Sequence, residues 1–184
     1  MIDLITEARA FQDFCHNLKW KFCFIGGLAV QHWGEPRLTR DVDVSVLTGF
    51  GPEDEFISAI LKNYEPRFAD AAQFAAQHRV LLVQTSSGVD FDISLAALPF
   101  EEEMIRRSVS IEYLPGVDLK VCSAEDLIVL KCFANRVQDW QDVKSIVERQ
   151  GSQNLIWDYI LTSVAPLVEL KGEPQIVERL KTLQ

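Results

Sequence analysis

Hydrophobic positions near the start of the chain follow a helical period and then give way to short apolar runs. Apolar side chains recur every three or four residues from Leu4 to Leu18, which is the spacing of one face of an amphipathic helix. Two apolar runs follow, one ending at paired glycines and one alternating valine with aspartate, and both are typical of strands. The first part of the chain therefore predicts a helix over 3–18, a strand over 22–25, a helix over 28–33 and a strand over 42–47.

The middle of the chain alternates helical patterns with pairs of short strands. Pro52 suits the first turn of a helix, and an alanine-rich stretch follows that helix. The turn sequences Ser86-Ser87-Gly88 and Pro115-Gly116 each separate two apolar runs, so each predicts an antiparallel hairpin. The expected elements are helices over 52–62, 68–78 and 99–107, and strands over 80–84, 89–95, 108–113 and 118–121.

From Ser123 onward the pattern is helical throughout. Ser123 suits an N-cap, and Asp126 three residues later resembles the second half of a capping box, so a helix is expected to start here. Three further helices are expected, over 138–150, over 154–164 and over 173–183, and the second is expected to stop before Pro166.

Length and composition indicate a folded protein of one or two compact parts. The chain has 184 residues, of which 48% are hydrophobic, so it is long enough for a core and is not of the disordered class. It contains no Ser/Gly-rich linker and no repeat. We therefore expect a first domain over residues 1–121 and a helical C-terminal subdomain over 122–184 that packs on it.

Charge, hydropathy and cysteine content indicate which partners and which compartment to expect. The net charge of −9 argues against binding long nucleic acids, although tRNA stays among the alternatives. No apolar run reaches membrane-spanning length and the first residues are unlike a signal peptide, so we expect a cytoplasmic protein without a membrane partner. Four scattered cysteines are expected to be reduced and buried, namely Cys15, Cys23, Cys122 and Cys132.

Two short motifs suggest chemistry. Asp41 and Asp43 alternate with valines, so both carboxylates lie on one face of their strand. The two carboxylates repel each other unless a cation neutralises their charge. Mg²⁺ and Mn²⁺ bind oxygen ligands, and one ion often binds protein carboxylates and substrate phosphates together. Gly26 and Gly27 end the preceding apolar run, where glycine allows close approach to a phosphate at a helix N-terminus.

These motifs resemble the signature of the nucleotidyltransferase superfamily, which includes DNA polymerase beta and the aminoglycoside nucleotidyltransferases. The signature is an apolar residue and Gly-Gly, then a spacer, then Asp-x-Asp between apolar neighbours; here thirteen residues separate Gly27 from Asp41. The sequence around Arg37, Thr39 and Arg40 is similar to that of the AbiEii-type bacterial branch, as are residues 124–131 and 135–143.

The resemblance implies an α+β fold with a mixed or antiparallel sheet flanked by helices, followed by an all-helical part. It also implies a third carboxylate on a neighbouring strand, for which Asp92 is preferred and Asp90 is the fallback. The implied catalytic and metal-binding residues are Asp41, Asp43 and Asp92. The implied substrate-binding residues are Gly26, Gly27, Arg37, Thr39, Arg40 and Lys131.

The implied activity is transfer of a nucleoside monophosphate from an NTP, with Mg²⁺ or Mn²⁺, to a hydroxyl of a small molecule, an RNA or a protein. Two alternatives stay open. The protein is the toxin of a toxin–antitoxin pair with an antitoxin partner, or it is a non-catalytic nucleotide-binding relative. The intact pair Asp41 and Asp43, together with Asp92, argues against the second alternative.

Lys131 follows four apolar residues, so its charge needs either a partner or a route to the surface. One interpretation is a lysine that extends its amine to solvent, and the other is a cation that reaches the nucleotide phosphates. Asp139 and Asp142 lie three residues apart on one helix face. They either orient Lys131 or Arg136, or cap and solvate their own helix.

Overall fold

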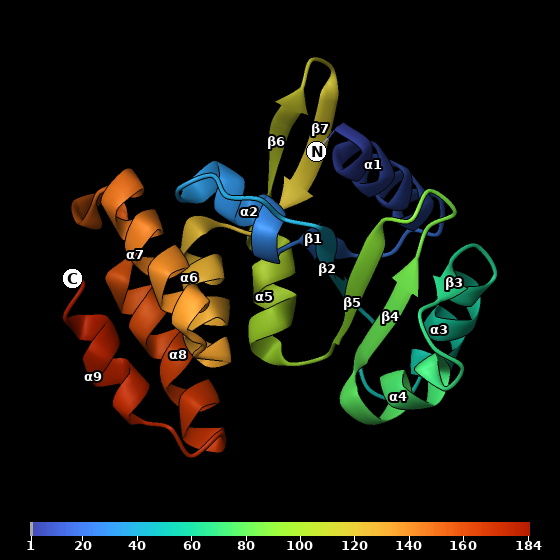
Figure 1. The fold of residues 1–184 in the computed structure, drawn as a ribbon. Coiled ribbons are helices and arrows are strands. Elements are labelled where there is room, and N and C mark those ends of the chain that lie inside the picture. Colours follow the sequence, from blue (N-terminus) through green and yellow to red (C-terminus); the bar gives the residue numbers. More distant parts are fainter. Residues whose placement is uncertain (1) are drawn as a thin grey trace. The chain divides into compact units, whose positions relative to one another are not determined.

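The structure is a computed structural model that describes residues 2–184 (Figure 1). Residue 1, where the predicted first domain begins, lies outside the described part. The chain forms two compact units. Unit 1 extends to Leu28 and resumes from Leu38 to Cys122, whereas unit 2 combines Ala29–Arg37 with Ser123–Gln184. The short segment Ala29–Arg37 thus belongs with the C-terminal helices, although the sequence assigns it to the first domain.

Unit 1 is built on a seven-stranded mixed sheet within the described residues, with strand order β3-β4-β5-β2-β1-β7-β6. The pairs β2–β5 and β1–β7 are parallel and the other neighbours are antiparallel. The predicted α+β class with a mixed sheet and helices is confirmed. The strands are β1 (Phe22–Phe24), β2 (Asp41–Leu47), β3 (Glu65–Pro66), β4 (Val80–Gln84), β5 (Asp90–Ala96), β6 (Val109–Leu114) and β7 (Val117–Val121).

One face of the central strands forms the core of unit 1. In β2 and β5 every second side chain is apolar and fully buried, for example Val42, Val44, Phe91 and Ile93. Phe11 of the first helix packs on this face, with its ring centroid 5.2 Å from that of Phe91. Burial of each such side chain stabilises the fold by about 1.5–3 kcal/mol. The alternation therefore fixes which face of β2 and β5 is left for polar residues.

The helices of unit 1 follow the sequence prediction closely. The predicted hairpins 80–95 and 108–121 are present, and both predicted glycine-containing turns connect their strands. The two-residue strand β3 was not predicted, because two exposed residues carry no periodicity. The helices are α1 (Ile2–Asn17), α2 (Gly26–Trp33), α3 (Glu53–Leu61), α4 (Ala71–His78) and α5 (Pro99–Arg107), and α2 continues into unit 2 from Ala29.

Unit 2 is helical. The hydroxyl of Ser123 accepts a hydrogen bond from the backbone N–H of Asp126 at 3.2 Å, as the predicted N-cap requires. Besides the end of α2, the unit contains α6 (Ala124–Ala134), α7 (Val137–Gln150), the 3₁₀ turn η1 (Ser152–Asn154), α8 (Trp157–Leu170) and α9 (Gln175–Lys181).

The prediction that a helix stops before Pro166 is wrong. α8 passes through this proline and ends at Leu170. The apolar face of the helix continues beyond it, because Val164, Leu167 and Val168 are buried at helical spacing. Burial of this face outweighs the backbone hydrogen bond that proline cannot donate.

The four cysteines are buried, as predicted, and none of them forms a disulfide within the described residues. Burial raises the pKa of the Cys132 thiol to about 12, so this side chain behaves as a small apolar residue. None of the helices in residues 2–184 combines the length and the apolar character needed to cross a bilayer.

Candidate metal and nucleotide site

The register of two parallel strands in unit 1 brings the candidate carboxylates together. β2 and β5 pair so that Asp41 lies opposite Asp90 and Asp43 lies opposite Asp92. Alternate side chains share one face of a strand, so all four carboxylates lie on the face opposite the apolar core. Among residues 2–184, Asp41, Asp43 and Asp92 each offer an oxygen within 4.8 Å of the oxygens of the other two. We call these three residues the carboxylate group, and Asp90 is not a member of it.

The carboxylate group fits a hard divalent ion. Mg²⁺ binds oxygen at about 2.0–2.1 Å, so two of its ligand oxygens lie at most about 4.2 Å apart. Oxygens within 4.8 Å of one another reach that arrangement by small changes in side-chain rotamer. All three side chains are half-buried, which leaves room for further ligands such as water or phosphate. The residues present therefore fit Mg²⁺ or Mn²⁺.

Both glycines of the motif are required by the close approach of unit 1 side chains. Gly26 has φ +58°, and a Cβ there would lie 1.9 Å from Oδ2 of Asp43. A Cβ on Gly27 would lie 2.2 Å from the hydroxyl oxygen of Thr39. A side chain at either position would therefore displace a residue of the candidate site.

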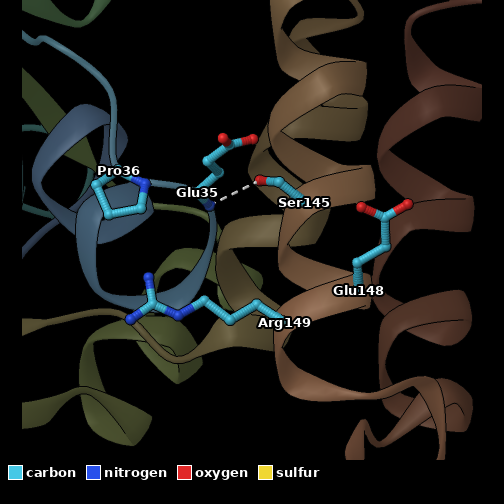
Figure 2. A pocket seen from close by; sticks show the side chains of 5 residues that line it. All are labelled: Glu35, Pro36, Ser145, Glu148 and Arg149. Atoms are coloured by element: carbon cyan, nitrogen blue, oxygen red, sulfur yellow. Dashed lines mark hydrogen bonds between the residues drawn. The ribbon is translucent and has the colours of Figure 1, made fainter.

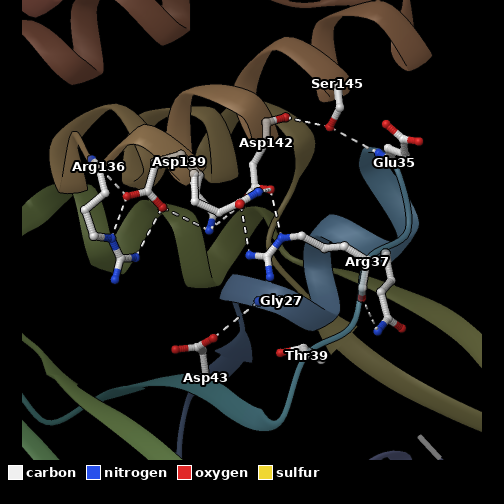
Figure 3. Close-up of polar contacts among 12 residues, drawn as sticks. Gly27, Glu35, Arg37, Thr39, Asp43, Arg136, Asp139, Asp142 and Ser145 are labelled. Carbon is white, nitrogen blue, oxygen red and sulfur yellow. Dashed lines mark hydrogen bonds and ion pairs between the residues drawn. The ribbon is translucent and has the colours of Figure 1, made fainter.

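The start of α2 is held by the second aspartate of the motif. The backbone N–H of Gly27 donates to Oδ2 of Asp43 at 3.3 Å (Figure 3), and that of Ile25 donates to the Asp43 carbonyl at 2.9 Å. A carboxylate at a helix N-terminus is stabilised by the helix dipole. The helix begins at Gly26, so the predicted start at Leu28 is two residues late. Glycine has low helix propensity, and here the contact with Asp43 overrides it.

Thr39 orients the first aspartate. Its hydroxyl donates to Oδ1 of Asp41 at 3.0 Å and lies 3.3 Å from the Asp41 carbonyl. The same threonine packs against Gly27, as described above. The structure thus places Thr39 between the glycine turn and the carboxylate group. Arg40 lies next to Asp41 in the chain and is exposed.

Arg67 is a member of the site that the sequence did not indicate. It follows β3, and its guanidinium Nη1 donates to Oδ1 of Asp92 at 2.6 Å, while Nε lies 3.9 Å from Oδ2 of Asp90. A single arginine after two exposed residues gives no sequence signal. Its position depends on the pairing of β3 with β4, which brings residues 65–67 beside β4, the neighbour of β5.

The environment of Asp92 differs from that of its neighbour Asp90. Burial raises the pKa of Asp92; the charge of Arg67 opposes this, and the charges of Asp41 and Asp90 add to it, so the net shift is upward. Asp90 instead accepts a hydrogen bond from the side-chain amide of Gln84 at 2.9 Å. Of the two candidates for the third carboxylate, the structure therefore places Asp92 in the carboxylate group and Asp90 beside it.

Two predicted phosphate-binding cations, Arg37 and Lys131, lie in unit 2 and are bound to carboxylates there. The Lys131 amine lies 2.8 Å from Oδ2 of Asp142 and 3.2 Å from Oδ1 of Asp139. Arg37 binds Asp142 through two nitrogens at 2.9 and 3.0 Å, and Arg136 binds Asp139 at 2.7 Å. The interpretation that Lys131 extends to solvent is wrong, since its side chain is only 8% exposed. Asp139 and Asp142 pair with it, which agrees with the interpretation that these aspartates orient Lys131 or Arg136. Asp139 also caps its own helix, since it accepts the backbone N–H of Arg136 at 3.1 Å.

These contacts stabilise the ionised carboxylates. Burial raises the pKa values of Asp139 and Asp142, but hydrogen bonds from Arg136 and Arg37, together with the Lys131 charge, lower them more. The net pKa shift is downward for both. We call the five residues the ion-pair chain of unit 2, and they are Arg136, Asp139, Lys131, Asp142 and Arg37.

A hollow of about 520 Å³ lies beside the ion-pair chain in unit 2 and is lined by none of the predicted site residues (Figure 2). Its wall includes a hydrogen bond from the backbone N–H of Glu35 to the Ser145 hydroxyl at 3.1 Å. The guanidinium of Arg149 donates to the Gly34 carbonyl, which ties the end of α2 to α7. The remaining lining residues are Pro36 and Glu148.

Over residues 1–161 the chain matches a sequence family described as nucleotidyltransferases of unknown function, DUF6036. The chain belongs to this family. The match includes the glycine turn, the carboxylate group and all five residues of the ion-pair chain. Family membership confirms the nucleotidyltransferase resemblance that the motifs predicted. No curated protein sequence matches the chain.

Solved structures share the family's fold at low sequence identity. An antigenic nucleotidyltransferase-like protein from Paracoccidioides brasiliensis is 16% identical with a TM-score of 0.52, and the match covers 97% of this chain and 92% of that protein. The antibiotic-resistance factor ANT(2'')-Ia in solution is 12% identical with a TM-score of 0.53, covering 93% of this chain and 91% of that one. A crystal structure of ANT(2'')-Ia in complex with adenylyl-2''-tobramycin is 12% identical with a TM-score of 0.50, and the match covers 92% of this chain and 96% of that one. At these identities the likeness concerns the fold.

Proposed function

We propose that the protein is a metal-dependent nucleotidyltransferase, which moves a nucleoside monophosphate from an NTP to a hydroxyl acceptor. The observation that carries this proposal is the position of the carboxylate group beside a glycine turn at the start of α2. Carboxylates supply the oxygen ligands of Mg²⁺, and glycines allow the backbone to approach a phosphate. Membership of a nucleotidyltransferase family supports the same reaction class.

Each candidate residue of unit 1 is assigned a role from its position in the site. Asp41 and Asp43 on β2 and Asp92 on β5 would hold the ion, and Thr39 fixes the carboxylate of Asp41. Arg40, which is exposed and precedes Asp41 in the chain, would add positive charge for an incoming NTP. A bound divalent ion would offset the negative charge of the phosphate oxygens and of the leaving pyrophosphate.

The reaction requires one bond to form and one to break. The acceptor hydroxyl oxygen bonds to the α-phosphorus, and the bond from that phosphorus to the pyrophosphate oxygen breaks. The hydroxyl proton passes to a carboxylate oxygen of Asp92 or to water. Most of the rate enhancement would come from holding these groups in line and from electrostatic stabilisation.

For the donor we propose ATP. ANT(2'')-Ia, which shares the fold, was crystallised with adenylyl-2''-tobramycin, an adenylylated compound. The acceptor is open among a small molecule, an RNA and a protein, and the net charge of −9 favours a small molecule or a protein.

The decisive experiment incubates the protein with each α-labelled NTP, Mg²⁺ and either a metabolite extract or total RNA. We expect label to appear in one acceptor fraction, with ATP as donor, and to disappear with EDTA. Asp43→Asn should abolish labelling, while Asp54→Asn on the exposed surface of α3 should leave it unchanged. Labelling that survives Asp43→Asn would contradict the proposal.

A toxin of a toxin–antitoxin pair would use the same site with a protein partner. Growth arrest on expression of the wild type, absent in Asp43→Asn and relieved by the product of an adjacent small gene, would assign that role.

A further inference from the structure

Arg67 is held beside the carboxylate group by backbone pairing. β3 pairs with β4 so that Pro66 lies opposite Val83, and the N–H of Arg67 donates to the Leu82 carbonyl at 3.1 Å. Leu82 is in turn the β4 partner of Asp92. The backbone of Arg67 is therefore fixed on the strand row that contains Asp92, and its side chain reaches across β4 to that carboxylate.

The guanidinium makes its shortest contact with the member of the carboxylate group that lies on β5. Nη1 of Arg67 lies 2.6 Å from Oδ1 of Asp92, a charge-assisted hydrogen bond. The two side chains are 33% and 36% exposed. A guanidinium stays protonated throughout the usual pH range, so it can leave this carboxylate only by moving.

The charge of the carboxylate group explains why a cation is bound there. Asp41, Asp43 and Asp92 bring three negative charges within 4.8 Å when ionised, and Arg67 offsets one of them. A divalent ion at the same group would lie within a few ångströms of the guanidinium, and like charges at that separation repel. The long, partly exposed arginine side chain can rotate towards solvent, whereas the strands that carry the carboxylates are fixed by their register.

We propose that Arg67 is a built-in counterion of the carboxylate group, and that a divalent ion binds by displacing its guanidinium from Asp92. This inference rests on the proposed function, because it requires the carboxylate group to bind a metal ion. Arg67 thereby lowers the affinity for metal in the nucleotide-free protein. The displaced guanidinium keeps Asp90 within reach, since Oδ2 of Asp90 lies 3.9 Å from Nε of Arg67, and it stays at the edge of the group that an NTP phosphate would approach.

The test is Mn²⁺ binding to the nucleotide-free protein, measured by calorimetry or by electron paramagnetic resonance. Arg67→Gln should bind Mn²⁺ roughly three- to tenfold more tightly than wild type, since it removes both the competing ion pair and the repulsion. Arg67→Lys keeps the charge without the planar fork and should fall between the two. Arg9→Gln removes an exposed arginine that pairs with Asp13 on α1, and it should leave the affinity unchanged.

A double variant isolates the contact. In the Asp92→Asn background, Arg67→Gln should change the Mn²⁺ affinity much less than it does in the wild type. Equal or weaker Mn²⁺ binding by Arg67→Gln would overturn the counterion role and leave the proposed function standing. If neither wild type nor Arg67→Gln binds Mn²⁺, with or without ATP, the metal-dependent function falls as well.

Discussion

Oδ2 of Asp43 lies 1.9 Å from the position that a Cβ of residue 26 would take, so Gly26 and Asp43 exclude any larger residue at this turn. The aspartate that is a candidate metal ligand is also the residue that packs against the glycine and accepts the N–H of Gly27. Local folding and the candidate chemistry therefore depend on the same carboxylate.

Gly26→Ala should both destabilise the protein and disrupt the carboxylate group. The left-handed φ of +58° alone costs roughly 1–2 kcal/mol for a residue with a Cβ, and the clash with Asp43 adds to it. Gly88→Ala is the matched control, because it has φ +85° with no atom within 4 Å of the added Cβ. Urea unfolding should show a larger loss for Gly26→Ala, and only Gly26→Ala should lose Mn²⁺ binding. Equal losses in both variants would mean that the contact with Asp43 is unimportant.

Asp43→Asn and Asp43→Ala should separate helix capping from metal binding. Both remove the charge and should abolish Mn²⁺ binding and transfer. Asparagine retains an acceptor for the Gly27 N–H, whereas alanine loses it at a cost of about 0.5–2 kcal/mol. Thermal melts of the metal-free variants measure the difference. If the two variants unfold at the same temperature, the hydrogen bond contributes nothing to stability.

Asp92→Asn should lose nearly all nucleotidyl transfer, while Asp90→Asn should keep a substantial fraction. Successive side chains on one face of a strand are roughly 7 Å apart, so only one of the two carboxylates can lie at the depth of the group. Asp92 does so and Asp90 does not. Turnover of the two variants at saturating Mg²⁺ and ATP decides, and the reverse ranking would assign the third position to Asp90.

Asp142→Asn should destabilise the protein by about 3 kcal/mol or more at pH 7, because it leaves the buried Lys131 amine with a weakened partner. The pKa of Asp142 is lowered in the folded state, so its stabilising effect is complete above the unfolded-state pKa. The difference from wild type should thus shrink as the pH falls below about 4. Urea unfolding at pH 7 and pH 3 tests this. Lys144→Gln, which removes an exposed ion pair with Glu148, should have almost no effect at either pH. A constant difference between Asp142→Asn and wild type would show that ionisation of Asp142 is irrelevant.

The sequence alone predicted those elements whose hydrophobic pattern and terminal residues indicate the same structure. Residues 99–107 match α5 at both ends, because Pro99 suits the first turn and arginines occupy the last. The alternation around Asp41 and Asp43 predicted both the strand and its polar face. These features depend on neighbours within a few residues along the chain.

The features that the sequence did not predict depend on contacts between distant segments. Arg67 reaches Asp92 only because β3 pairs with β4. α8 continues past Pro166 because its buried face does so. That Lys131 is paired and does not extend to solvent became visible only once Asp139 and Asp142 were seen on α7 beside it. No periodicity within one segment carries this information.

The ion-pair chain of unit 2 alternates in sign, with two carboxylates shared among three cations. Replacing Lys131 alone leaves two buried carboxylates short of a cation, and replacing either aspartate alone leaves the buried Lys131 amine with one carboxylate in place of two. Replacing a cation and a carboxylate together avoids this imbalance. Along an evolutionary path, single changes at Lys131, Asp139 or Asp142 would therefore be selected against even in a descendant that had lost its enzymatic role. We expect these three positions to covary in the family, and to be exchanged for apolar residues only as a set.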